Sequence, residues 1–321
     1  MMSQSNRNNV LTTYLDKYAL ITVFAIMILI FSLISQSFFT LSNLINILVQ
    51  ASAMGIATVG AAMVILQGGV DLSAGSCMFL SMVVCSRFFN MNLGLVPLVL
   101  ISVATGALLG CLNGLFVAYI KVIPFITTLG TMTLGRGLGL TISEAKIVIF
   151  SDASATVLRN ARVLGIPVIV LVLAAILVLA QVVLTNTGFG RQLYAIGNNQ
   201  LAAVKIGINV KRRRFHVYIL SGAFSGLSGF IFSAQSGSIS PDFGKGQEFI
   251  FISAAVLGGV SLFGGKGKIF PGVLLGILII TVIENGLVIV GANPYAYQIV
   301  RGLIILFAVV IDCIKYKGDL R

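Results

Sequence analysis

Long apolar runs, separated by short polar segments, dominate the chain. Residues 88–120 and 163–190 contain no charged residue, and between Lys17 and Arg87 only Asp71 is ionisable at neutral pH. The core of a bilayer needs ~20 consecutive, mostly apolar residues for each helix. The runs are continuous and do not alternate with a period of two, which favours membrane helices over a membrane β-barrel. The pattern predicts an all-α, polytopic membrane protein.

The apolar runs predict about ten transmembrane helices in a single transmembrane domain, 1–321. Two connecting segments are large, an outer loop at about 142–165 and an inner, cytoplasmic loop at about 185–214. The ten predicted spans are about 18–35, 44–66, 74–89, 95–119, 122–141, 166–184, 215–233, 248–263, 269–290 and 296–313.

The basic residues orient this topology. Most of the 21 Lys and Arg residues fall in segments that are cytoplasmic if the N-terminus is inside, among them the run from Lys211 to Arg214. An excess of Lys and Arg marks the cytoplasmic loops of membrane proteins. With an even number of spans, both termini are predicted to be cytoplasmic.

Composition excludes several other classes of protein. The chain is 58% hydrophobic and only 9% charged, whereas about a quarter of the residues of a soluble domain are charged. The net charge of +12 does not indicate a nucleic-acid partner, because the basic residues lie at the ends of apolar runs. With one histidine and four cysteines that lack metal-ligand spacing, we expect no metal, cofactor or catalytic site.

The chain also lacks an ATP-binding loop. The segment Gly264–Lys268 has the glycines and lysines of such a loop, but Val260 stands where the first Gly is required and Gly267 where Ser or Thr is required. We therefore predict that the chain is not an enzyme. Energy for any transport must come from a partner.

The inner loop contains one short predicted helix. Asn199 is a good N-cap, Gln200–Ile206 has helical character, and Gly207 follows as a helix terminator. Leu201 and Val204 are three residues apart and give the helix a small apolar face. Two interpretations stand at this point: an amphipathic connector, or a docking element for a cytoplasmic partner.

Several motifs together resemble the permease subunit of bacterial ABC importers for monosaccharides of the ribose, galactose and arabinose type. The resemblance runs from about residue 15 to 315 with compatible spacing. The segments that carry it are Gly68–Gly75, Pro124–Met132, Thr187–Arg191, Ala195–Gly197, Ser221–Gly222, Ala254–Leu262, Gly264–Gly265 and Asn285–Leu287.

The resemblance implies that the short helix lies in a cleft of an ATP-binding subunit and couples ATP hydrolysis to transport. This chain departs from the usual family pattern at Asn198, where a second Gly is common, and at Gln200 and Leu201, where acidic residues are common. A more apolar contact with the ATPase is therefore expected. The positions that match the family in this coupling segment are Gly190, Arg191, Gly197, Asn199, Ala202, Ala203 and Gly207.

The resemblance also implies the partners and the location. They are a cytoplasmic ATP-binding subunit, a soluble sugar-binding protein and a second permease chain, in the bacterial cytoplasmic (inner) membrane. The two permease chains form a homodimer or a heterodimer, and a homodimer is favoured. The predicted function is import of a neutral pentose or hexose. The alternative is a proton-coupled secondary transporter of a small neutral solute, which would need buried carboxylates, and Glu284 is the only one in the middle of a predicted span.

The Gly68–Gly69 pair is expected to end one helix before Asp71 caps the next, with assistance from Ser73. A direct role in gating is the alternative for this motif. Polar side chains within the spans either line a route for a polyol or bond across helix interfaces. The candidates for the pathway or gate are Asn113, Phe125, Thr127, Thr128 and Asn285.

Two charged residues lie at similar depth in adjacent predicted spans. Glu284 and Arg301 are each several residues from the short connection between the ninth and tenth spans. Charged groups at such depth are rarely unpaired. We predict that they pair with each other or share a network with Arg136, and the alternative is that Arg301 extends toward the membrane surface while Glu284 is protonated.

Overall fold

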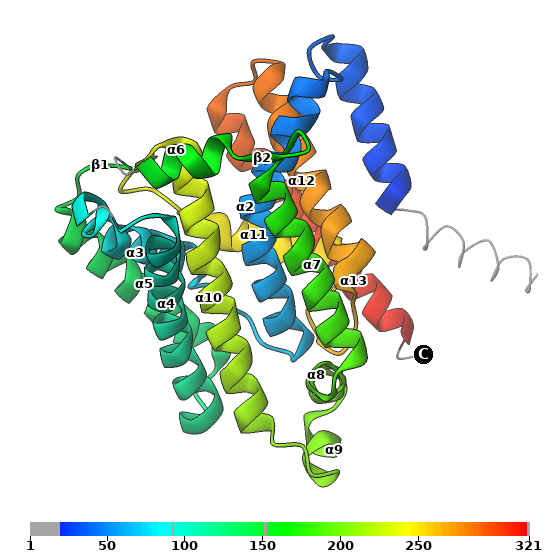
Figure 1. Cartoon of the computed structure of the whole chain (residues 1–321). Coiled ribbons are helices and arrows are strands. Elements are labelled where there is room, and N and C mark those ends of the chain that lie inside the picture. Colours follow the sequence, from blue (N-terminus) through cyan, green and yellow to red (C-terminus); the bar gives the residue numbers. More distant parts are fainter. Residues whose placement is uncertain (1–19, 92, 151–152, 320–321) are drawn as a thin grey trace, which may run out of the picture.

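The computed structural model describes residues 20–91, 93–150 and 153–319. This part of the chain is helical apart from short strands, in agreement with the helical prediction (Figure 1). The elements are the helix Leu20–Ile34, α2 (Leu41–Leu66), α3 (Ala74–Ser86), η1 (Phe89–Met91), α4 (Leu95–Gly114), η2 (Leu115–Ile120), α5 (Pro124–Ser143), β1 (Val148–Ile149), α6 (Ala153–Asn160), β2 (Arg162–Val163), β3 (Ile166–Pro167), α7 (Val168–Asn186), α8 (Gly188–Asn198), α9 (Gln200–Lys205), α10 (Val210–Ser236), β4 (Ser238–Ile239), α11 (Gln247–Leu257), η3 (Ile269–Val273), α12 (Leu274–Ile289) and α13 (Pro294–Asp319).

Helix α2 is the centre of the core. Every residue from Ala51 to Leu66 is buried, because α7, α10, α11 and α12 pack around it. A helix that is apolar on all sides can be covered in this way. The hydroxyls of Ser52 and Thr58 are also buried, and each donates to the backbone carbonyl four residues earlier, at 2.7 and 2.8 Å.

Helices α4 and α10 approach closely because glycines line their contact. A Cβ at Gly106 would overlap the carbonyl oxygen of Gly222, and a Cβ at Gly222 would overlap that of Gly106. Gly110 and Gly226 lie one helical turn further along and face backbone atoms of the opposite helix in the same way. Small residues four apart allow such close approach between membrane helices. This contact fixes α10 against the first half of the chain.

The two large connecting segments lie at opposite ends of the helix bundle. In Figure 1, α8 and α9 lie at the bottom, whereas α6 and the strands β1 and β2 lie at the top. At the top, β1 pairs antiparallel with β4, with Val148 opposite Ile239. Arg159 of α6 donates to the carbonyl of Ala234 near the end of α10, from Nη2 at 2.9 Å and from Nε at 3.1 Å.

The structure corrects the prediction of about ten spans. Three apolar helices within the described residues are shorter than the others, namely Leu20–Ile34, Gln247–Leu257 and Tyr295–Val310. The helices of the described part that are long and apolar enough to cross a membrane number 6: Leu41–Leu66, Ala74–Met91, Leu95–Ile120, Val168–Asn186, Val210–Ser236 and Ile269–Ile289.

Glycine turns and polar residues explain why fewer helices than predicted are long and apolar enough to cross a membrane. Helix α11 ends at Leu257, and Gly259 then has a φ of +86°, which a helix does not allow. At ~1.5 Å per residue, the 11 residues of α11 reach about half of the ~30 Å hydrocarbon thickness. Helix α5 is long, but Thr, Gly and Arg residues reduce its hydropathy. The prediction that both termini are cytoplasmic rested on the ten predicted spans, and it is withdrawn together with them.

Candidate functional site

The segment between α7 and α10 folds into two short, capped helices. The hydroxyl of Thr187 accepts a hydrogen bond from the N–H of Gly190 at 3.3 Å, which caps α8. The side chain of Asn199 accepts one from the N–H of Ala202 at 3.0 Å, which caps α9. Gly207 follows with a φ of +83°. The short helix expected at 200–206 is therefore present as α9, Gln200–Lys205.

Helix α9 is attached by one face and presents apolar side chains on the other. Ala203 is 1% exposed and packs with Ile196 of α8 and Val210 of α10. Leu201 is 76% exposed and Val204 is 55% exposed. Burying exposed apolar area against a partner would stabilise a complex. The geometry suits a docking element better than a simple connector.

Glycine allows α8 to approach two other segments of the chain. A Cβ at Gly197 would overlap the carbonyl oxygen of Leu66, at the end of α2, and the backbone nitrogen of Gly265. That nitrogen donates to the Leu66 carbonyl at 2.8 Å. We call this meeting of α8, the end of α2 and the 258–268 loop the glycine junction. Helix α8 is therefore in direct contact with the end of α2 and with the loop that precedes η3 and α12.

Two side chains of α8 strengthen the glycine junction. The amide of Asn198 donates to the carbonyl of Gly265 at 3.3 Å, so the residue that departs from the family pattern has a local role. The hydroxyl of Tyr194 donates to the carbonyl of Gly267 at 2.8 Å. Burial raises the pKa of Tyr194 above its ordinary value.

Basic residues of α10 hold the two short helices in place. Arg213 donates to the side chain of Gln192, and its guanidinium lies 5.6 Å from the ring centroid of Phe189. Arg214 donates to the side chain of Gln200 at 2.9 Å.

The remaining family-matched positions of the segment differ in their surroundings. Gly190 packs so closely on the backbone of Leu184 that a Cβ would overlap it. Arg191 and Ala202 are exposed.

Asp71 is a buried carboxylate in the turn between α2 and α3, and it is 2% exposed. Its Oδ1 accepts hydrogen bonds from the backbone N–H of Ser73 at 2.9 Å and from the hydroxyl of Ser73 at 2.6 Å. Its Oδ2 accepts one from the hydroxyl of Ser221, in α10, at 2.7 Å. Ser73 is the N-cap residue of α3 but makes no side-chain cap bond. Asp71 thus orders the turn before α3 and does not bond an N–H of the helix itself.

The hydrogen bonds continue from Ser73 into two more helices. The Asn113 amide of α4 donates to the Ser73 hydroxyl at 2.7 Å. The Thr131 hydroxyl of α5 donates to the Asn113 carbonyl oxygen at 2.6 Å. We call Thr131, Asn113, Ser73, Asp71 and Ser221 the polar network. It joins the start of α3 to α4, α5 and α10. Glycine again shapes this turn, because Gly68 has a φ of +78°.

The other pathway candidates occupy different environments. Asn285 is 5% exposed, and its side-chain oxygen accepts from Asn43 of α2 at 3.0 Å. The Thr128 hydroxyl donates to the Pro124 carbonyl within α5 at 2.9 Å. Thr127 is 7% exposed and its hydroxyl has no partner among the described residues, whereas Phe125 is 53% exposed on the surface of α5. Asn113 and Asn285 thus connect helices.

The structure brings Glu284 and Arg301 together. Arg301 Nε donates to Glu284 Oε1 at 2.7 Å, and the side chains are 32% and 24% exposed, respectively. Arg136 lies elsewhere: its Nη1 donates to the carbonyl of Phe243 at 2.6 Å, and its guanidinium lies 4.8 Å from the ring centroid of Phe79. The pair therefore connects α12 to α13 without Arg136.

Comparison with known proteins identifies the family. Residues 43–309 match the family described as "Branched-chain amino acid transport system / permease component". The chain is 35% identical to the ribose import permease protein RbsC of Haemophilus influenzae, over 99% of each chain. It is 37% identical to RbsC of Escherichia coli K12, over 89% of this chain and 90% of that one. The chain belongs to this family of ABC transporter permeases.

A third relative extends the similarity to hexose importers. The galactose/methyl galactoside import permease protein MglC of Escherichia coli K12 is 35% identical to this permease, over 98% of this chain and 99% of the relative. No solved structure matches the permease. The permease is a multi-pass protein of the inner membrane, and ATP is hydrolysed on a separate ATP-binding subunit.

Two carboxylates of the permease, Asp312 and Glu248, were not among the candidate site residues predicted from the sequence. Asp312 of α13 accepts hydrogen bonds through Oδ2 from the N–H of Leu262, at 2.8 Å, and from the hydroxyl of Ser261, at 3.3 Å. It holds the 258–268 loop against α13. Glu248 of α11 is 6% exposed, and its Oε2 lies so close to Gly75 that a Cβ there would overlap it. A carboxylate within a membrane span is a signal of function, but Glu248 and Asp312 fall at the ends of the predicted spans 248–263 and 296–313, where this signal is weak.

Neutralising both members of the Glu284–Arg301 pair is expected to cost less stability than the two single changes together. Each single change, Glu284→Gln or Arg301→Gln, leaves one charge without its partner. Because both side chains are less than one-third exposed, we expect a coupling energy of about 1–2 kcal/mol, between the values for surface and buried pairs. Unfolding of the three variants in mixed micelles measures it. Strictly additive losses would contradict a stabilising pair.

Proposed function

We propose that this permease carries a neutral monosaccharide, a pentose or a hexose, which an external binding protein delivers to it. Near full-length similarity to permeases named for ribose, galactose and D-allose carries the proposal. Two of the interior carboxylates are satisfied within the permease, since Glu284 is paired with Arg301 and Asp71 is bonded to serine hydroxyls. Unpaired charges inside a membrane typically mark ion or proton pathways.

The segment 185–214 is the cytoplasmic coupling segment in this proposal, and the segment 142–165 lies at the outer side. The two segments are at opposite ends of the bundle in Figure 1. The basic residues from Lys211 to Arg214 lie beside α8 and α9, which suits the cytoplasmic side. The exposed apolar side chains of α9 form the surface that docks on the ATP-binding subunit.

The complete importer in this proposal contains two identical permease chains in the bacterial cytoplasmic membrane. Each permease chain offers one α9 to an ATP-binding subunit, and the soluble sugar-binding protein docks at the opposite end. The glycine junction connects the docked helix to α2 and to the loop before α12. Closure of the ATP-binding subunits would therefore move helices of the transmembrane core.

The experiment is ATP-dependent uptake in proteoliposomes that hold the permease with its own ATP-binding subunit and binding protein. Radiolabelled ribose, galactose, allose and leucine are compared, because the family description refers to amino acids. We expect uptake of at least one monosaccharide, dependent on ATP and on the binding protein, and none of leucine. Uptake of leucine alone, or monosaccharide uptake driven by a proton gradient without ATP, would contradict the proposal.

A further inference from the structure

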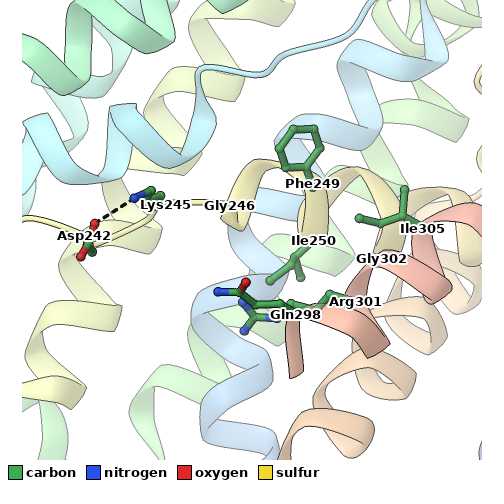
Figure 2. A pocket seen from close by; sticks show the side chains of 9 residues that line it. All are labelled: Asp242, Lys245, Gly246, Phe249, Ile250, Gln298, Arg301, Gly302 and Ile305. Atoms are coloured by element: carbon green, nitrogen blue, oxygen red, sulfur yellow. Dashed lines mark hydrogen bonds and ion pairs between the residues drawn. The ribbon is translucent and has the colours of Figure 1, made fainter. Parts of the chain in front are cut away.

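A cavity of about 510 Å³ lies between the start of α11 and the first half of α13. Asp242 and Lys245 stand at its edge, in the connection between β4 and α11, which packs on Gly75 at the start of α3. Figure 2 shows the side chains of Gln298 and Arg301 next to each other in this cavity, near the start of α11. Sites for small molecules typically measure ~300–1,000 Å³.

The side chains around the cavity combine hydrogen-bonding groups with an aromatic ring. Arg301 uses Nε for Glu284, and its terminal nitrogens have no hydrogen-bond partner within the described part of the chain. Gln298 is exposed and offers both a donor and an acceptor. Phe249 contributes a ring that is 47% exposed. Sugar hydroxyls both donate and accept, and the C–H face of a sugar is apolar, so these groups complement it.

The charges at the cavity cancel, which favours a neutral solute. Lys245 is bonded to Asp242 at 3.3 Å (Figure 2) and Arg301 is bonded to Glu284 at 2.7 Å. A phosphorylated or carboxylated solute would meet no net positive charge here. A neutral polyol needs only oriented hydrogen bonds, which the paired and therefore well-positioned Arg301 supplies.

We propose that this cavity is the site at which the permease receives its monosaccharide. The inference rests on the proposed function and assigns it to named residues: Arg301 and Gln298 bond the hydroxyls, and Phe249 covers the apolar face of the sugar. Glu284 acts through Arg301 as a positioning residue. The cavity lies at the start of α11, and the other end of α11 leads into the 258–268 loop at the glycine junction. The sugar is therefore received one short helix away from the coupling segment, before ATP-driven movement of the helices carries it further.

Filling the cavity tests the proposal. Gly302 lines it, and a Cβ at Gly302 would meet no atom within 4 Å, so Gly302→Leu narrows the cavity without strain at the backbone. We expect the KM for sugar uptake to rise by roughly tenfold or more, as misfit in a binding pocket does. The matched control is Leu303→Phe, which adds bulk at the next residue, 60% exposed and outside the cavity lining.

A labelling experiment gives a second readout that does not depend on transport. Gly302→Cys is made in a background with Cys111→Ser and Cys313→Ser, the two partly exposed cysteines of the described residues. We expect the transported monosaccharide to slow maleimide labelling of this cysteine, and leucine to have no effect. Gln298→Ala should weaken this protection, and Gln298→Asn should restore part of it.

The outcomes separate the site from the function. If the wild-type permease imports a monosaccharide while Gly302→Leu and Gln298→Ala leave the KM unchanged, the assigned cavity is wrong and the proposed function stands. If no sugar slows labelling of the cysteine at position 302, the assigned site is also wrong. This readout remains available if Gly302→Leu fails to assemble. If the wild-type importer carries no monosaccharide, the proposed function itself fails.

Discussion

The variant Ala203→Pro is expected to lose almost all solute uptake while the helix bundle stays folded. The N–H of Ala203 makes the first hydrogen bond of α9, to the carbonyl of Asn199 at 3.0 Å, and a proline removes it. A proline inside a helix costs ~3 kcal/mol, which lowers the population of the helix on the order of 100-fold. In the proposed coupling mechanism, loss of α9 separates ATP hydrolysis from movement of the transmembrane helices. Uptake and ATP hydrolysis are measured together in proteoliposomes.

The control for this variant is Gln200→Pro. Gln200 is the first residue of α9, where proline is tolerated, and the preceding Asn199 already has extended backbone angles, φ −157° and ψ 101°. We expect nearly normal uptake. Both Gln200 variants lose the hydrogen bond from Arg214. Gln200→Ala therefore measures the effect of that loss without proline. Normal uptake by Ala203→Pro would show that α9 is only a connector.

Leu201→Glu tests the docking surface without disturbing the fold. Leu201 is 76% exposed, so a charged side chain there costs the isolated permease little. If Leu201 enters an apolar site on the ATP-binding subunit, the buried carboxylate weakens the complex, by a few kcal/mol for an unpaired charge. Co-purification of the two subunits measures this loss. Undiminished binding by Leu201→Glu would place the docking contact elsewhere.

The second large effect is expected from Asp71→Ala. This change removes the acceptor of three hydrogen bonds and leaves the Ser73 N–H, the Ser73 hydroxyl and the Ser221 hydroxyl without it. Unsatisfied buried donors cost ~1–3 kcal/mol each, partly offset because a buried carboxylate is also removed. We expect a net loss of about 2–4 kcal/mol in the free energy of unfolding. Titration with denaturing detergent measures it.

Two variants control the Asp71 prediction. Asp71→Asn keeps one carbonyl oxygen as acceptor and should lose about half as much stability. Ser76→Ala removes a single buried bond, from the Ser76 hydroxyl to the carbonyl of Ser73 at 2.8 Å, and should cost about 1 kcal/mol. If Asp71→Ala were as stable as the wild type, the polar network would not hold α3, α4, α5 and α10 together.

Features that depend on residues close together in the sequence could be predicted from the sequence. The helical class follows from continuous apolar runs, because every backbone polar group in a membrane must be satisfied within its own segment. Helix α9 follows from the cap at Asn199 and the glycine at Gly207, which act within one turn. The contact between Glu284 and Arg301 was predicted because a short connection makes the helices that carry them adjacent neighbours.

The number of membrane-spanning helices could not be predicted, because apolar composition does not fix backbone conformation. The 258–268 loop is part of an apolar run, yet Gly259, Gly264 and Gly265 have positive φ there. Gly264 and Gly265 are required where the loop meets Gly68, just after α2, and Gly197 and Asn198 of α8. That contact joins residues almost 200 positions apart, such as Leu66 and Gly265, and no local pattern encodes it.

The roles of the polar residues were likewise decided by tertiary structure. From the sequence, Asp71 was a local helix cap and Asn113 a candidate for the pathway. In the fold they are linked through Ser73, and Asp71 is also bonded to Ser221, 150 residues away. The sequence by itself determined which polar groups lie inside the membrane helices. Only the packing of the helices decided whether each group faces another helix or a cavity, because the glycine contacts between helices set which sides come together.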